Sequence, residues 1–194
     1  LVRILQVLPA TDSHRNEYIT TFQEMAAALK GCQRIDGFWN PDLLNPDNYG
    51  GKETSGTAFF VYGLAWGINN GFLDSTAYLS CVEDGWNGLV NDALHDNGFL
   101  GWVQSTGKDP SAGQPLSYNK VPNFEDYGLG AFLLAGSEVY KLADGSPPTP
   151  NPTAISTPTP AITDAPTPDP TSTSTPAPAI TDAPTPDPTS TSTP

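Results

Sequence analysis

The chain has 194 residues, with 8 Lys or Arg against 21 Asp or Glu, and its formal net charge is −13 at pH 7. A chain this acidic has no basic stripe that could meet phosphates, which excludes a typical nucleic-acid-binding protein. No stretch approaches the roughly 20 apolar residues of a membrane span, so we expect no transmembrane segment.

The first part of the chain predicts two helices followed by a loop. Residues 1–8 read as a short helix that Pro9 ends, because proline cannot continue a helix. The next helix carries an apolar stripe at three- and four-residue spacing, formed by Ile19, Phe22, Ala26, Leu29 and Cys32. A loop with Gly and Pro breaks then leads to Gly51, and it carries Trp39.

A buried helix is predicted in the stretch Glu53–Asn69, which Asn69-Asn70-Gly71 ends with a usual C-terminal signal. Apolar residues cover nearly every side of this segment, which is typical of a helix enclosed by other helices. Thr54 or Ser55 is expected to cap its N-terminus through a hydroxyl, and Glu53 stands beside the positive helix end, where a carboxylate is favoured. Two interpretations stay open: ordinary helix capping, and a polar site that faces a ligand.

The second part of the chain predicts two more helices joined by a strand and a loop. An apolar stripe from Tyr78 to Ala93 indicates an amphipathic helix with one wet side. The alternation in Phe99–Gln104 predicts a short strand, and a long loop follows it to Pro122. A largely apolar helix then begins near Glu125 and closes at Gly145.

The only two cysteines are Cys32 and Cys81. Without a nearby pair of histidines they make no zinc pattern, and we expect no metal site. Each lies on the apolar side of a predicted helix, which favours two buried thiols. A disulfide is the alternative if the protein is secreted.

The composition changes sharply after residue 145. All 19 aromatic residues lie before this point, whereas residues 146–194 contain 15 Pro and 20 Ser or Thr. Such a segment cannot bury enough apolar surface to offset the entropy of an ordered chain. The stretch Ala161–Pro176 recurs as Ala179–Pro194, with a period of 18 residues. We therefore expect a globular part over 1–145 and a disordered Pro/Thr/Ser linker over 146–194, which implies a further C-terminal module.

The order of the helices suggests an all-α toroid. Two strongly apolar helices alternate with two amphipathic ones, as inner and outer helices do in an α/α barrel. Both inner helices begin with a polar cluster, Glu53–Thr57 in one and Glu125–Gly128 in the other. If the two helices run in the same direction, these clusters share one mouth.

Several stretches together resemble glycoside hydrolase family 105, the unsaturated rhamnogalacturonyl hydrolases, which are close in fold to family 88. They are Trp39, Glu53–Ala58, Tyr62–Ile68, Gly71–Leu73, Trp86, Gly101–Gln104 and Tyr127–Val139. The resemblance covers the chain from Leu1 to about Ala143. It implies part of a six-hairpin (α/α)6 barrel that removes a 4,5-unsaturated uronic acid from the non-reducing end of pectin (rhamnogalacturonan) fragments. It also implies that no cofactor is needed.

The same resemblance implies that the catalytic aspartates lie upstream of Leu1. We therefore assign no catalytic residue in this chain and expect the chain by itself to be inactive. In the family, an aspartate protonates the double bond, water adds, and the resulting hemiketal rearranges and expels the neighbouring sugar.

The candidate residues for substrate binding are Trp39, Glu53, Thr54, Ser55, Trp102 and Asp126. The two tryptophans lie on predicted loops, where an indole face can stack on the C–H groups of a sugar. Thr54 and Ser55 could bind a substrate carboxylate at the helix N-terminus, which is a ready anion site. Asp126 could be a polar group of the pocket or an ordinary helix cap. Trp66 and Trp86 lie on helical stripes and are expected in the core.

Two other points remain expectations. A non-catalytic carbohydrate-binding or cell-surface module on a linker is the alternative function, although helical composition disfavours it because most sugar-binding modules are β-sandwiches. The Pro/Thr linker favours an extracellular or cell-surface location.

Overall fold

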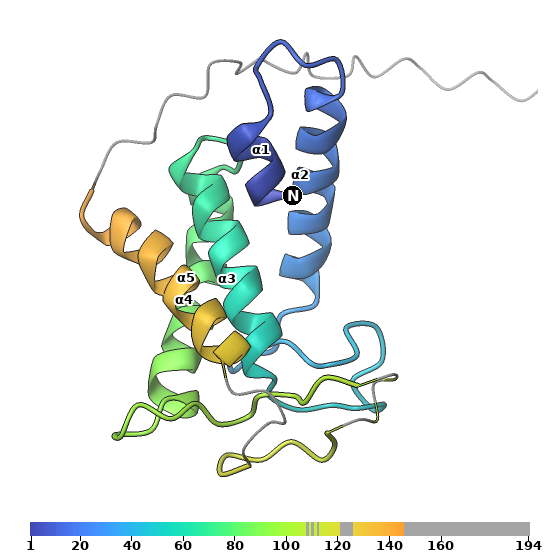
Figure 1. Cartoon of the computed structure of the whole chain (residues 1–194), viewed down its shortest axis with the longest axis vertical. Helices are drawn as coiled ribbons and strands as arrows, with labels where there is room; N and C mark the ends of the chain where they lie inside the picture. The colour runs from blue at the N-terminus through green and yellow to red at the C-terminus, as the bar shows by residue number, and fades with distance from the viewer. Residues whose placement is uncertain (108, 110, 112, 121–125, 146–194) are drawn as a thin grey trace, which may run out of the picture. The chain divides into compact units, whose positions relative to one another are not determined.

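The computed structural model describes residues 1–107, 109, 111, 113–120 and 126–145, and the side chain of Asp126 lies outside this description. The helices are α1 (Val2–Val7), α2 (Arg15–Gly31), α3 (Thr54–Asn69), α4 (Ser75–Gly88) with its π-helical extension η1 (Leu89–Ala93), and α5 (Asp126–Ala143). The prediction of an all-α chain is confirmed over these residues (Figure 1). The predicted linker over 146–194 lies outside them.

The predicted strand over Phe99–Gln104 is wrong. The described residues contain no strand, and the alternation yields only an isolated bridge between Leu94 and Leu100. A strand needs a partner along its length for its backbone groups. Here the backbone of this segment bonds instead to a helix end and to a neighbouring loop, as described below.

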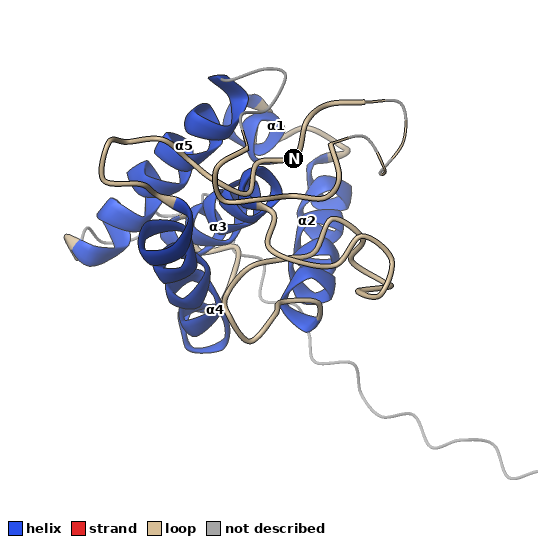
Figure 2. Cartoon of the chain, turned by 90° about the horizontal axis from the view of Figure 1, so that it is seen from below, coloured by secondary structure: helices blue, strands red, loops and turns tan. Residues whose placement is uncertain are grey.

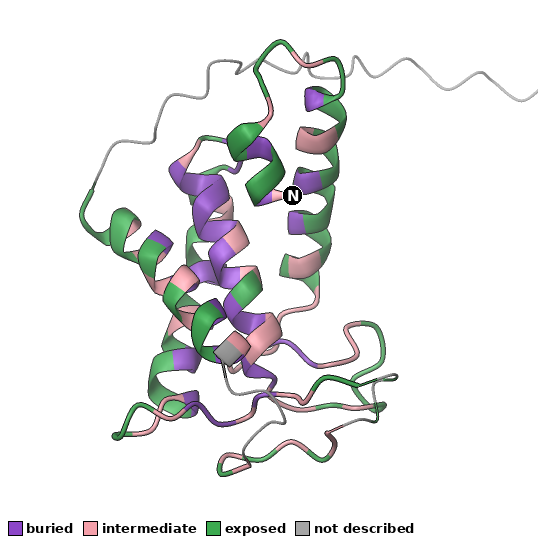
Figure 3. Cartoon of the chain, viewed as in Figure 1, coloured by how far each residue is buried: buried purple, intermediate pink, exposed green. Residues whose placement is uncertain are grey.

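Helix α3 is the centre of the described fold. It lies between α2 on one side and α4 and α5 on the other (Figure 2), and most of its residues are buried (Figure 3). Its apolar side chains therefore meet neighbours in most directions, as the sequence predicted, although Phe59 is 47% exposed and Phe60 is half-buried. The Asn69-Asn70-Gly71 signal ends it, with Gly71 at φ 70°, a conformation that favours glycine.

The core is built around aromatic side chains of α3 and its neighbours. Trp66 stacks on Phe72 with ring centroids 5.1 Å apart, and Phe22 of α2 meets Trp66 edge-on at 5.7 Å. Trp86 of α4 stacks on Phe132 of α5 at 5.0 Å. The expectation that Trp66 and Trp86 belong to the core is confirmed, with Trp66 buried and Trp86 half-buried against it.

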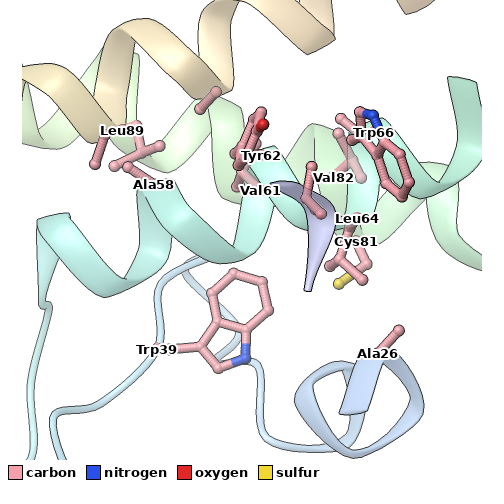
Figure 4. Packing of buried hydrophobic residues seen from close by; sticks show 14 of the residues in the cluster. Ala26, Trp39, Ala58, Val61, Tyr62, Leu64, Trp66, Cys81, Val82 and Leu89 are labelled. Carbon is pink, nitrogen blue, oxygen red and sulfur yellow. The ribbon is translucent and has the colours of Figure 1, made fainter. Parts of the chain in front are cut away.

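Cys32 and Cys81 are free thiols, as the helical pattern favoured. Cys81 is buried beneath α3 (Figure 4), while Cys32 is half-buried at the end of α2. Burial raises the pKa of the Cys81 thiol to about 11, because a thiolate would lose its hydration there.

Polar side chains hold the loop between α2 and α3 in place. Arg34 forms a bidentate pair with Asp36, with Nε–Oδ1 at 3.0 Å and Nη2–Oδ2 at 2.9 Å. Its Nη1 donates to Asn40 Oδ1 at 2.8 Å, and the same oxygen accepts from the Gly51 amide at 2.9 Å. Asn40 thus joins the two ends of the loop, and Trp39 lies within the part that is fixed.

No helix in the described part of the chain is both long and apolar enough to cross a bilayer.

Candidate functional site

The N-termini of α3 and α5 meet at the end of the helices where the loops gather (Figure 1). Two hydrogen bonds join them through the backbone of Gln104. The Gln104 amide donates to Glu53 Oε1 at 3.0 Å, and the Tyr127 hydroxyl of α5 donates to the Gln104 carbonyl. The two inner helices therefore start side by side, and the prediction of a shared mouth is confirmed. We call this region, formed by residues 53–56, 101–104 and 126–128, the mouth.

Glu53 is the N-cap of α3. Its Oε1 accepts from the Ser55 amide at 3.0 Å and from the Ser55 hydroxyl at 2.8 Å, and its Oε2 accepts from the Gly56 amide at 2.6 Å. The carboxylate satisfies free amides of the first turn and lies at the positive end of the helix, two reasons for its stability there. The prediction that Thr54 or Ser55 provides the cap is therefore wrong.

Thr54 is not available to a substrate. It is 0% exposed, and its hydroxyl donates to the Gly101 carbonyl at 2.6 Å. Ser55 is half-buried and directs its hydroxyl to Glu53. The negative charge of Glu53 already occupies the anion site at this helix end, so a substrate carboxylate would meet repulsion there. The proposed carboxylate contact through Thr54 is thus corrected, and the role of Thr54 is to hold residue 101.

Trp102 lies on the segment that the α3 N-terminus holds. The Thr54 amide donates to the Trp102 carbonyl, and the Trp102 amide donates to the Ser117 carbonyl, both at 3.0 Å. Trp102 has φ 59°, in the left-handed region, which costs a non-glycine residue roughly 1–2 kcal/mol. Its side chain is half-buried, with the Tyr118 ring at a centroid distance of 6.3 Å. Strain of this kind persists where surrounding contacts impose it, and it is frequent at ligand sites.

Trp39, the other predicted sugar contact, is a core residue. It lies against α3 (Figure 4) and is 1% exposed. Its indole Nε1 donates to the Leu29 carbonyl at 2.7 Å. Its ring meets Phe60 edge-on at 5.4 Å, and its amide donates to Thr57 Oγ1 at 3.0 Å. No face of the ring is left for a sugar, so this prediction is wrong. The local sequence showed a loop, but burial of that loop under α3 depends on tertiary packing.

Asp126 is the first residue of α5, so its backbone lies at the mouth. Its side chain is not among the described parts, and its role stays a prediction. The neighbouring Tyr127 was missed by the sequence analysis. Burial raises the pKa of the Tyr127 phenol, and the negative charge of Glu53 raises it further. Its position at a predicted polar helix start was the signal that could have identified it.

The loops beside the mouth bring further aromatic rings together. The His95 ring stacks on Tyr118 with centroids 3.5 Å apart, and its Nε2 lies 2.9 Å from the Tyr118 carbonyl. Phe99 meets the same imidazole edge-on at 5.0 Å. Tyr118 connects His95 to the neighbourhood of Trp102. The long-range contact between residues 95 and 118 left no local signal.

Among the described residues, no group of three His, Cys, Asp or Glu side chains is arranged to hold a metal ion.

Comparison with known proteins identifies relatives over about three quarters of the chain. Residues 1–143 match Glycosyl Hydrolase Family 88. The chain is 41% identical over 144 residues to an unsaturated 3S-rhamnoglycuronyl hydrolase of Formosa agariphila, covering 74% of this chain and 36% of that protein. A solved structure of a family 88 glycosyl hydrolase from Bacteroides vulgatus matches with 43% identity and a TM-score of 0.67, over 72% of this chain and 39% of that one.

A solved glycoside hydrolase of family 105 from C. acetobutylicum ATCC 824 also matches, with 26% identity and a TM-score of 0.58, over 72% of this chain and 42% of that one. The chain thus spans well under half the length of the relatives it matches. Its helices form part of a six-hairpin α/α toroid, and the predicted fold class is confirmed.

Proposed function

The chain belongs to Glycosyl Hydrolase Family 88, and from this we propose that it is part of a glycoside hydrolase. The proposed enzyme removes a 4,5-unsaturated uronic acid from the non-reducing end of an oligosaccharide. The observation that carries the proposal is the 41% identity to a hydrolase named for unsaturated rhamnoglycuronyl substrates. The finer proposal is a specificity of the family 105 type, in which rhamnose is the sugar next to the unsaturated uronate, as in fragments of rhamnogalacturonan. The likeness to a family 105 structure supports this.

The proposed reaction is a hydration of the double bond. A carboxylic acid donates a proton to one carbon of the bond, and water adds at the other and loses a proton. The resulting hemiketal rearranges, its ring opens, and the neighbouring sugar leaves with its oxygen. No residue of this chain is assigned as that acid, and the catalytic aspartates are proposed to precede Leu1.

The part proposed for this chain is to shape one side of the sugar site. Trp102 is the substrate contact that we retain, because it is half-buried at the mouth and belongs to a loop. An indole face and the C–H side of a pyranose ring can bury apolar surface against each other. We retain Asp126 as a second candidate, since it begins α5 beside Tyr127.

The test is the loss of ultraviolet absorbance from the conjugated uronate when the enzyme is mixed with unsaturated disaccharides. Two forms are compared: this chain, and the chain extended upstream by the region that its relatives contain. We expect the extended form to consume an unsaturated uronyl-rhamnose, and we expect this chain alone to be inactive. The unsaturated disaccharide incubated without enzyme is the control for non-specific loss of signal.

The other outcomes decide between the alternatives. If only a substrate without rhamnose is consumed, the proposed family 105 specificity is contradicted, but the proposal of a hydrolase stands. No consumption of any unsaturated substrate by the extended form, together with binding of the sugar, would favour a non-catalytic carbohydrate-binding role.

We also propose an extracellular or cell-surface location, supported by the Pro, Ser and Thr content of residues 146–194. The linker is proposed to tether a further C-terminal module. Fractionation of the native source, with an antibody against residues 1–145, tests this, and a signal confined to the cytosol would contradict it.

A further inference from the structure

We propose that Glu53 is a positioning residue, which holds the segment Gly101–Gln104 so that Trp102 is presented to the sugar, and that it is not itself a substrate ligand. The inference rests on the proposed function for the identity of the sugar. It reverses the sequence-based expectation that Glu53 binds substrate.

The first argument is that the Glu53 carboxylate is buried and hydrogen-bonded by the protein. It is 6% exposed and accepts four hydrogen bonds, from the amides of Ser55, Gly56 and Gln104 and from the Ser55 hydroxyl. Three of these bonds go to Oε1 and one to Oε2, and the burial of the residue leaves little surface at which a sugar hydroxyl could reach the remaining acceptor position. Hydrogen bonds to a charged acceptor are stronger than neutral ones, which makes this a firm anchor.

The second argument is that one of these four bonds crosses 51 residues of sequence. Capping of α3 alone would not require Glu53 to accept a hydrogen bond from the Gln104 amide. The adjacent Thr54 adds two more bonds to the same segment, from its amide to Trp102 and from its hydroxyl to Gly101. Residues 53 and 54 therefore hold both sides of Trp102.

The third argument is that the rest of the segment has little room to move. A Cβ atom at Gly101 would lie 2.3 Å from the Tyr118 carbonyl oxygen, so the two backbones are in close contact. Val103 is 3% exposed and packs against Gly128 of α5, where an added Cβ would lie 3.0 Å from Val103 Cγ2. The residues before and after Trp102 are thus locked, and the left-handed backbone at 102 sets the direction of the indole.

The conservative variant Glu53→Gln tests this chemistry with little change of volume. An amide replaces one acceptor oxygen with an NH2 group, which would face a backbone N–H or the Ser55 hydroxyl. We expect the cap of α3 to weaken and the tether to Gln104 to loosen. The matched control is Asp74→Asn, because Asp74 caps α4 through the Thr76 amide and hydroxyl, both at 2.8 Å, and these bonds lie within the first turn of that helix.

The first measurement is hydrogen–deuterium exchange on the full 194-residue chain. In Glu53→Gln we expect the Gln104 amide to exchange about tenfold faster or more, because its acceptor is weakened. Asp74→Asn should leave the exchange of residues 101–104 unchanged. Equal exchange at Gln104 in wild type and Glu53→Gln would overturn the proposal. If Glu53→Gln fails to fold by near-ultraviolet circular dichroism, Glu53→Asp, which keeps a capping carboxylate but shortens its reach to the Gln104 amide, is measured in its place with the same expected result.

The second measurement is a double-mutant cycle on binding of an unsaturated uronyl-rhamnose disaccharide, followed by calorimetry. We expect Trp102→Phe to weaken binding about tenfold, Glu53→Gln about fivefold, and the double variant about tenfold, since Glu53 acts through Trp102. Asp74→Asn should bind as wild type does. Additive losses would show that Glu53 affects the sugar independently and would overturn the proposal.

The two levels of inference fail differently. A wild-type chain that binds none of the unsaturated disaccharides would refute a substrate site in this chain, and the presentation of Trp102 to a sugar would be refuted with it. Faster exchange at Gln104 in Glu53→Gln would still show that Glu53 holds the segment.

Discussion

The buried position of Trp39 leads to a measurable separation between folding and sugar binding. We predict that Trp39→Phe destabilises the chain and leaves its affinity for the disaccharide unchanged. Trp102→Phe should do the reverse, with a loss of stability below about 1 kcal/mol, because a half-buried loop side chain supports little of the core.

The size of the Trp39 effect follows from two contacts. The first is the hydrogen bond from Nε1 to the Leu29 carbonyl at 2.7 Å, and its loss costs about 1 kcal/mol. This is not the larger cost of an orphaned acceptor, because the Leu29 carbonyl also accepts from the Cys32 amide at 3.0 Å. The second is the packing of the larger ring, which meets Phe60 and lies close to Gly85. Loss of this packing costs about 1–2 kcal/mol more.

The expected total is about 2–3 kcal/mol, a large part of the roughly 5–15 kcal/mol that stabilises a typical domain. Urea unfolding followed by far-ultraviolet circular dichroism measures it, with calorimetry for disaccharide binding. If Trp39→Phe binds the sugar more weakly and unfolds at the wild-type urea concentration, then Trp39 is a sugar contact and the reasoning from burial is wrong.

Two further pairs of measurements test the packing and the buried thiol. Gly85→Ala should destabilise the chain by about 1–2 kcal/mol, since the new Cβ would lie 2.6 Å from Val61 Cγ2 in the core. Gly63→Ala should stabilise the chain by about 0.5–1 kcal/mol through helix propensity, because no atom lies within 4 Å of the new Cβ. Urea unfolding of both variants measures the two effects. Cys81 should resist alkylation in the folded chain while Cys32 reacts, as peptide mass spectrometry would show, and equal labelling would contradict its burial. Because burial raises the pKa of Cys81 from 9.0 to about 11, its contribution to stability should be full below pH 9.0 and fall as the pH rises through that interval, and Cys81→Ala should lack this loss.

The sequence was sufficient for the helices of the described fold. Apolar spacing identified the central helix, and the Asn-Asn-Gly stop signal marked its end at the residue where the structure ends it. These features depend on contacts within a few residues, which periodicity reports directly. The resemblance read from short motifs also led to the correct superfamily of helical glycosidases, since residues 1–143 match family 88.

The site was harder to predict because its contacts join distant residues. Glu53 rather than a hydroxyl caps α3, and it does so while binding an amide 51 positions away. Trp39 and Trp102 both lie in loops, yet only tertiary packing buries one under α3 and leaves the other half-buried at the mouth. Local sequence identifies a residue as a loop tryptophan, but its exposure depends on which helices cover that loop.

By itself, then, the sequence determined the all-α character, the buried helix α3 and the group of six-hairpin glycosidases to which family 88 belongs, because hydrophobic periodicity and short motifs are local properties. The tertiary structure alone decided which polar groups at the mouth are occupied. A carboxylate that looks available in the sequence is engaged by four donors in the fold, three of them from its own helix end and one from a distant loop. The physical reason is that buried polar groups must find partners, and those partners come from wherever the fold brings the chain together.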